Sequence, residues 1–267
     1  FMKRKQKREL EKNKKKKKIK SFTKKIVRYL IYLILIFLLI YSGSKIYKWY
    51  KENKNKDIII DKINEAVMVE DDNSNDEKKY NIDFSILKEQ NNETVAWIKV
   101  NNTNIEYPVV KTKNNDFYLT HSFDKSYNSA GWIFADYRNK IDGTDKNIIV
   151  YGHNRRDGSM FENLKKTLNA NWYENIENRN IIFNTENENC NYEIFSIYQI
   201  ETEEYYIQTE FKNETEFSKF VETLKKRSVK NFETEVSSSD SILTLSTCAN
   251  NNKYRVVVHA KKVLKGE

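Results

Sequence analysis

The chain has 267 residues, of which 39% are hydrophobic and 13% aromatic, enough apolar side chains for one sizeable domain with additional segments. This composition excludes a largely disordered protein. The formal net charge of +9 would suit a nucleic-acid-binding protein, but the positive charge lies at one end. Residues 1–25 contain 14 Lys and Arg against two Glu, and the remainder has 33 basic and 36 acidic residues, so we expect no nucleic-acid partner.

An apolar segment directly follows the basic residues, at positions 26–47. A helix of this length spans roughly 33 Å, close to the ~30 Å hydrocarbon core of a bilayer. Because Lys and Arg favour the cytoplasmic side of a span, we expect a basic cytoplasmic tail at 1–25, a single transmembrane signal anchor at 26–47 and an extracellular remainder. A cleaved signal peptide is the alternative, because Ser42-Gly43-Ser44 resembles a cleavage site.

Two kinds of segment follow the apolar stretch. Residues 48–80 are rich in Lys, Asn, Asp and Glu, which predicts a stalk, and the apolar positions from Ile58 to Val69 indicate a short helix within it. Residues 81–267 consist of short β-prone runs separated by Asn, Asp and Gly, which is typical of a mainly β domain.

Eight strands and two helices are expected in this domain. The candidate strands are Thr94–Val100, Ile105–Lys111, Gly131–Arg138, Asn147–His153, Ile181–Thr185, Tyr192–Ile200, Ile242–Cys248 and Tyr254–Val263. The candidate helices are Ser159–Leu168 and Glu214–Arg227, each with apolar residues along one face. Eight short strands favour a closed barrel or a sandwich.

Three residues at strand ends suggest a nucleophilic site. Cys248 and His153 each end a candidate strand, and Arg255 opens the last strand, seven residues after the cysteine. Thiol catalysis needs a thiolate, a proton donor for the leaving group and a positive group or N–H donors for the oxyanion. Each residue alone is weak evidence, since a cysteine at a strand end is more often a small core residue. Their combination favours a cysteine-dependent active site at the barrel rim.

The other cysteine and histidine residues have simpler interpretations. Cys190 could pair with Cys248, since two cysteines in an exported domain can form a disulfide, but one lies in a polar stretch and the other ends an apolar strand. We interpret His121 and His259 as packing or hydrogen-bonding residues. No Cys/His cluster has zinc spacing, and no Gly-rich phosphate loop occurs.

Several motifs resemble those of the sortase family. The runs Thr244–Cys248 and Tyr254–Lys261 are similar to its cysteine and arginine signature, and Tyr151–Asn154 is similar to its histidine motif. Three longer stretches point to class B in particular: Asp116–Asn139, Gly152–Leu164 and the helix Glu214–Arg227 before the cysteine strand. The resemblance covers roughly residues 85–263 and implies an eight-stranded sortase β-barrel with helical additions.

By this resemblance the chain is a class B sortase, a cysteine transpeptidase of Gram-positive bacteria that anchors secreted proteins to the cell wall. The thiolate of Cys248 would attack the Thr carbonyl of a C-terminal sorting signal of LPXTG or NPXTX type. His153 would protonate the departing amine, and Arg255 would stabilise the oxyanion or hold the substrate. An amine of a peptidoglycan precursor would then resolve the thioester. The resemblance also implies that the reaction needs no metal and no organic cofactor. We also expect Ser246 and Thr247, just before the nucleophile, to contact the substrate.

Three alternatives stay open: a pilin-polymerising sortase, another exported cysteine hydrolase, and a non-catalytic wall-binding module. The chain also departs from some class B members, which carry acidic residues directly after the cysteine where this chain has Ala249 and Asn250. An acidic group there would orient the histidine, whereas Asn250 offers hydrogen bonds without charge. We therefore leave Asn250 out of the expected catalytic set.

Overall fold

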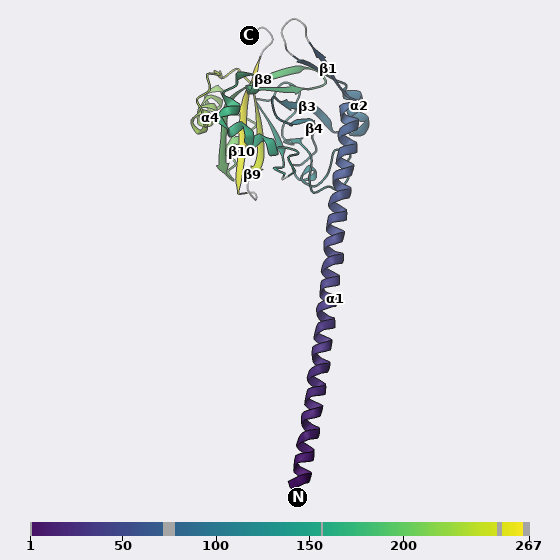
Figure 1. Ribbon diagram of the computed structural model, residues 1–267. Coiled ribbons are helices and arrows are strands. Elements are labelled where there is room, and N and C mark those ends of the chain that lie inside the picture. Colours follow the sequence, from purple (N-terminus) through teal and green to yellow (C-terminus); the bar gives the residue numbers. More distant parts are fainter. Residues whose placement is uncertain (1, 72–77, 156, 250–252, 264–267) are drawn as a thin grey trace. The chain divides into compact units, whose positions relative to one another are not determined.

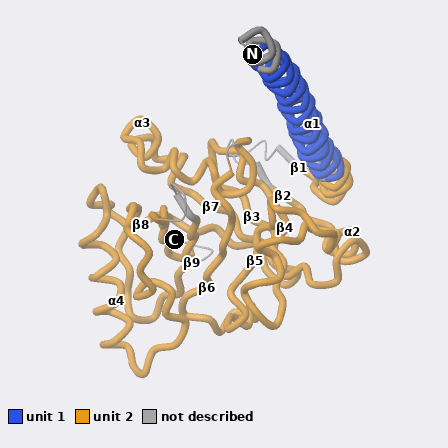
Figure 2. The backbone as a smooth tube through the Cα atoms, turned by 90° about the horizontal axis from the view of Figure 1, so that it is seen from below, with its two compact units in different colours: residues 1–57 blue, residues 58–267 orange. Residues whose placement is uncertain are grey.

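The structure is a computed structural model of the chain that separates into two compact units, coloured differently in Figure 2. The first unit comprises residues 1–57 and the second comprises residues 58–267. The residues that the structure describes are 2–71, 78–155, 157–249 and 253–263.

Helix α1 (Met2–Asn64) forms the described part of the first unit. It is the one helix among the described residues that is long and apolar enough to cross a membrane, judged by length and composition. The side chains from 26 to 47 are all exposed. Exposed apolar side chains over this length are what a lipid-facing helix requires, because hydrocarbon replaces water around them.

The second unit is built on a closed barrel, as the eight predicted strands indicated. Its strands are β3 (Thr94–Val100), β4 (Glu106–Val110), β5 (Phe134–Ala135), β6 (Asn147–Gly152), β7 (Asn180–Asn184), β8 (Asn189–Glu201), β9 (Ile242–Ala249) and β10 (Tyr254–Val263). Their order around the barrel is β10-β8-β7-β3-β4-β5-β6-β9, and β9 closes the ring on β10. The pairs β4–β5 and β6–β9 are parallel and the remaining pairs are antiparallel. The eight-stranded barrel is thus confirmed.

Short helices occupy the connections between the strands. They are α2 (Phe84–Gln90), η1 (Phe117–Leu119), η2 (Glu162–Leu168), α3 (Ala170–Tyr173), η3 (Ile176–Arg179), η4 (Tyr205–Ile207) and α4 (Glu214–Arg227), where η marks a 3-10 helix. Helix α4 has the predicted bounds because Asn213 caps it by accepting from the Glu216 N–H at 2.9 Å. It lies outside the barrel beside β8 and β10 (Figure 1).

Alternation along β10 separates two apolar clusters. Val256 and Val258 belong to the interior cluster of the barrel, whereas Val257 belongs to a second cluster beneath α4. Phe217 and Leu224 of α4 are almost fully buried in that second cluster. Because successive side chains on a strand point to opposite faces, one strand supplies both clusters.

Three local predictions differ from the structure, each for a definite reason. The strand expected over Gly131–Arg138 is reduced to β5, because Gly131 has a φ of +61° and the Asp136 carboxylate accepts from the Arg138 N–H and turns the chain. The helix expected from Ser159 begins only at Glu162, because Met160 has a φ of +57°.

The third difference concerns the expected stalk. The short helix predicted from Ile58 to Val69 is the end of α1 as far as Asn64, and a two-stranded hairpin of β1 (Val67–Asp71) and β2 (Lys78–Ile82) follows it. Ile59 and Ile63, one helical turn apart, are buried in the interior cluster of the second unit. The second unit therefore begins about twenty residues before the expected boundary at 81.

His259 lies in a buried polar cluster on the outer face of β10, as expected of a structural histidine. Its Nδ1 lies 2.8 Å from Thr244 Oγ1 and its Nε2 lies 2.9 Å from the Tyr198 hydroxyl. The single Thr244 hydroxyl hydrogen is donated to Asn147 Oδ1 at 2.7 Å, so Thr244 accepts from His259 Nδ1–H. The neutral ring therefore satisfies every contact, and burial lowers its pKa to about 3.

We predict that His259 makes the fold sensitive to acid. Its folded pKa lies below the ordinary histidine value of ~6.5, so its contribution to stability is complete above that value and decreases as the pH falls toward 3. Between pH 6.5 and 4.5, the free energy of urea unfolding should fall by about 2 kcal/mol more in wild type than in His259→Gln. His121→Gln, which replaces a half-buried ring, is the control. If the unfolding free energies of wild type and His259→Gln depend on pH in the same way, His259 is not the source of the acid sensitivity.

Candidate active site

The register of three strands brings the predicted site residues to one end of the barrel. In the parallel pair β6–β9, Gly152 lies opposite Thr247, so the next residues, His153 and Cys248, leave the pair at the same end. In the antiparallel pair β9–β10, Arg255 lies directly opposite Cys248. Since paired strands lie ~4.8 Å apart, the three backbone positions are neighbours although up to 102 residues separate them along the chain.

The structure describes these residues to different extents. The backbone of Cys248 belongs to β9, but its side chain lies outside the described part of the structure, and so does Asn250 entirely. His153 and Arg255 are both half-buried. The predicted convergence therefore holds for the backbone positions, while the contacts of the thiol itself stay a prediction.

A backbone carbonyl orients the His153 ring. The ring Nε2 lies 2.8 Å from the carbonyl oxygen of Leu119, the last residue of η1, so Nε2 carries the hydrogen and donates it. A carbonyl can accept this N–H both from the neutral ring and from the imidazolium. The contact therefore holds the ring in place in both protonation states. Sequence reasoning missed Leu119, because a backbone acceptor 34 residues away leaves no side-chain signal.

Two glycines allow close packing in this region, and one of them lies against the His153 ring. A Cβ on Gly131 would lie 2.9 Å from His153 Cδ2 and 2.5 Å from the Tyr118 carbonyl oxygen. A Cβ on Gly152 would lie 2.5 Å from Ile133 Cδ1. Real Cβ atoms do not approach so closely, so both positions require glycine for the close packing of the backbone. Sequence reasoning missed the role of Gly131.

The two predicted substrate-contact residues are buried in this structure. Ser246 and Thr247 are each 2% exposed. The Ser246 hydroxyl lies 2.9 Å from the Tyr206 hydroxyl, which joins β9 to η4. Ser246 thus holds a neighbouring loop against the strand that ends in the cysteine. Direct contact of either residue with a substrate stays a prediction.

Cys190 lies at the other end of the barrel and is a free, buried thiol. On β8 it precedes Ile200, the partner of Arg255, by ten residues, which corresponds to roughly 33 Å along the strand. A disulfide needs Cα atoms within about 7 Å, so the alternative pairing of Cys190 with Cys248 is wrong. Burial raises the pKa of the Cys190 thiol to about 11, which makes it a poor nucleophile.

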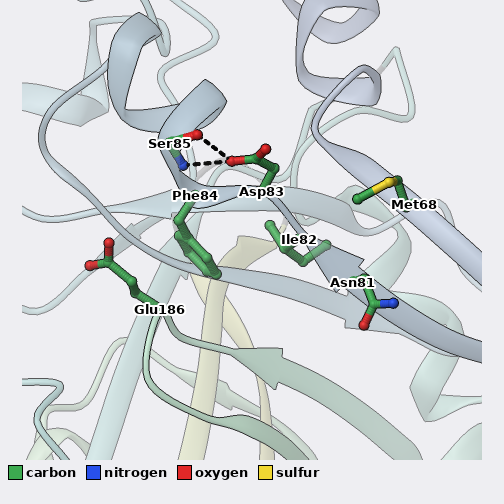
Figure 3. A pocket seen from close by; sticks show the side chains of 7 residues that line it. All are labelled: Met68, Asn81, Ile82, Asp83, Phe84, Ser85 and Glu186. Carbon is green, nitrogen blue, oxygen red and sulfur yellow. Dashed lines mark hydrogen bonds between the residues drawn. The ribbon is translucent and has the colours of Figure 1, made fainter.

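A pocket lies away from this rim. It has a volume of about 380 Å³ and borders the β1–β2 hairpin and the start of α2, as Figure 3 shows. The Asp83 carboxylate within it already accepts from the Ser85 N–H at 2.9 Å as the cap of α2. Among the described residues, no group of three or more His, Cys, Asp or Glu side chains is arranged to hold a metal ion. The Asp83 carboxylate in this pocket is thus used to cap a helix.

Comparisons with known proteins agree with the geometry. Residues 98–263 match the family model described as a sortase domain. Sortase B of Listeria monocytogenes is 35% identical over 250 residues, which cover 92% of this chain and 99% of that protein.

Solved structures are similar as well. A Staphylococcus aureus sortase B–substrate complex is 34% identical with a TM-score of 0.64, covering 68% of this chain and 85% of that chain. A sortase B complexed with triglycine is also 34% identical with a TM-score of 0.64, covering 68% of this chain and 86% of that chain.

We predict that Gly131→Ala destabilises the protein more than Gly143→Ala. Both glycines have positive φ, +61° and +90°, so both variants carry backbone strain of about 1–2 kcal/mol. Only Gly131 has neighbours within 4 Å of the added methyl group, so its variant should lose at least about 1 kcal/mol more in urea unfolding. The ring resonances of His153 should shift in Gly131→Ala alone. Equal losses and an unmoved ring would contradict this account.

Proposed function

The chain belongs to the sortase family and is a cysteine transpeptidase of the sortase B type, and we propose that it transfers secreted proteins to an amine of the cell-wall peptidoglycan. The proposed substrates carry a C-terminal sorting signal of LPXTG or NPXTX type, cleaved after Thr. The single observation that carries this proposal is the register that makes Cys248 the neighbour of His153 and Arg255. The substrate and triglycine complexes of similar sortase B proteins support a peptide donor and an amine acceptor.

In the first half of the proposed reaction, the Cys248 thiolate attacks the Thr carbonyl carbon of the sorting signal. The new C–S bond places negative charge on the carbonyl oxygen, and the Arg255 guanidinium stabilises that charge. When the C–N bond breaks, the departing amine takes a proton from the His153 imidazolium. The products are a thioester on Cys248, a neutral His153 and the released C-terminal fragment.

In the second half of the reaction, His153 acts as a base instead of an acid. The acceptor amine attacks the thioester carbon, and neutral His153 removes a proton from that amine. Collapse of the second tetrahedral state breaks the C–S bond and regenerates the thiolate. The new amide joins the secreted protein to the wall, and the enzyme returns to its starting protonation state.

Arg255 also explains how the thiolate forms. An ordinary cysteine with a pKa of ~8.5 is only about 3% thiolate at pH 7, and a histidine with a pKa of ~6.5 is about a quarter protonated. An unassisted pair would rarely be in the reactive state. A guanidinium beside the sulfur favours the thiolate electrostatically, so one residue serves both the nucleophile and the oxyanion.

We further propose that α1 anchors the enzyme in the cell membrane. The 14 Lys and Arg of residues 1–25 favour a cytoplasmic position for that end, which leaves residues 48–267 outside the cell. Residues 48–267 have 31 basic and 36 acidic residues, a small net negative charge. A nearly neutral domain suits work beside a charged wall without strong nonspecific attraction.

We predict that Cys248→Ala abolishes cleavage of a quenched fluorescent sorting-signal peptide while the fold persists. Removing the nucleophile removes the thioester route, so turnover should fall by at least about 10³-fold. Cys190→Ala is the matched control, because that buried thiol lies at the opposite barrel end and its loss should change turnover less than about twofold. Retained turnover in Cys248→Ala would end the assignment of the nucleophile.

Arg255→Lys tests the guanidinium. Lysine keeps the charge but loses the planar fork of donors, so we expect kcat to fall by about 10- to 100-fold with a smaller change in KM. The same assay at several pH values measures both parameters. A variant with wild-type kcat would show that positive charge alone suffices at this position.

A further inference from the structure

A buried carboxylate and an arginine form a bidentate pair directly after β5. Arg138 Nε donates to Asp136 Oδ1 and Arg138 Nη2 donates to Asp136 Oδ2, both at 2.8 Å. The Asp136 side chain is fully buried, whereas that of Arg138 is 36% exposed. We call these two residues the Asp136 brace. A bidentate pair of this kind is geometrically specific as well as charged.

The Asp136 brace makes three further contacts, each to a different segment. Asn115 Nδ2 donates to Asp136 Oδ2 at 3.0 Å, and the Tyr151 hydroxyl donates to the same oxygen at 2.8 Å. Arg138 Nη2 also donates to the Ile207 carbonyl oxygen at 2.9 Å. The brace therefore joins the loop before η1, strand β6 and helix η4, which are far apart in the sequence.

Each of these segments continues to the site rim. The loop that contains Asn115 leads into η1, whose Leu119 carbonyl holds His153. Helix η4 is hydrogen-bonded to Ser246 on the strand that reaches Cys248. Strand β6 reaches His153 two residues after Tyr151. The brace thus links the segment beside the histidine to the segment beside the cysteine strand.

The charged pair is suited to hold these segments over a wide pH range. Burial alone would raise the pKa of the Asp136 carboxyl, but the hydrogen bonds from Arg138 and Tyr151 outweigh it, and that pKa is lowered. The hydrogen bonds and charge of Asp136 raise the pKa of Arg138. An apolar pair of similar volume would fill the space but would offer no donor to Ile207.

We propose that the Asp136 brace positions the two segments that flank the bound peptide. On the proposed function, we place the sorting signal that reaches Cys248 between η1 and η4, because η1 contacts His153 and η4 contacts the strand that ends in the cysteine. The brace sets the separation of these two helices, so the precise fit of the peptide depends on it. Asp136 and Arg138 are thus positioning residues for substrate binding, and neither takes part in the chemical steps.

The test compares the full chain with Arg138→Lys, which keeps the charge but has no planar fork to reach Asp136 and Ile207 together. We expect KM for the fluorescent sorting-signal peptide to rise about tenfold with kcat within twofold. The rate of iodoacetamide alkylation at Cys248 should also stay within twofold, because this small reagent does not depend on the flanking helices. Amide hydrogen exchange in η4 should accelerate by at least tenfold.

Two further variants make the test specific. Asp136→Asn disrupts the brace from its buried side and should raise KM in the same way. Arg179→Lys is the matched control, because Arg179 Nε likewise donates to a backbone carbonyl, that of Tyr173 at 2.7 Å, but on α3 and not on a rim segment. Its KM should stay at the wild-type value.

The proposal is overturned if KM of the folded Arg138→Lys and Asp136→Asn proteins is unchanged, if kcat alone falls, or if Arg179→Lys has the same effect as Arg138→Lys. Wild-type protein that turns over no sorting-signal peptide would instead count against the proposed function. In that case hydrogen exchange decides about the brace, since unchanged exchange in η4 refutes it and faster exchange supports it.

Discussion

The pairing of β9 with a strand on either side is the constraint on which the site depends. Its parallel partner β6 delivers His153, and its antiparallel partner β10 delivers Arg255, both at the end that Cys248 reaches. A shift of one residue in either register would turn the functional side chain to the opposite face of the sheet. The barrel is closed, so neither partner can slip without disturbing the whole ring. Closure therefore converts three separate sequence motifs into one site.

The group that orients the His153 ring is an uncharged backbone carbonyl. This is relevant because the chain has no acidic residue directly after the cysteine. The Leu119 carbonyl holds the ring through Nε2 and adds no charge. A backbone carbonyl at this position restrains the ring by a hydrogen bond alone, with no second ionisable group. Orientation of the ring thus has a source independent of Asn250. Gly131 is part of the same arrangement, because a side chain there would collide with the imidazole.

Sequence patterns predicted the elements whose signals are local. The bounds of α4 follow from an Asn cap and an apolar face, and β10 follows from a β-branched run that alternates between two cores. The positions of His153, Cys248 and Arg255 at strand ends were readable for the same reason. The Leu119 acceptor and the Asp136 brace could not be predicted in this way. Their hydrogen bonds join residues that are between 2 and 69 positions apart, and several of the acceptors are backbone carbonyls. The β1–β2 hairpin was missed because its charged strands resemble a solvated linker.

The two faces of β9 have different roles: the inner face contributes apolar burial, and the outer face holds neighbouring segments in place. Leu243 and Leu245 on the inner face are fully buried in the apolar cluster of the barrel, where burial itself is favourable. Thr244 and Ser246 on the outer face are equally shielded but polar, and each is hydrogen-bonded to a group on another element. Apolar residues there would preserve the strand but remove the hydrogen bonds to His259 Nδ1 and to the Tyr206 hydroxyl, and losing a hydrogen bond at a buried polar group is costly. The outer face therefore determines where η4 lies, and with it one of the two segments beside the cysteine strand.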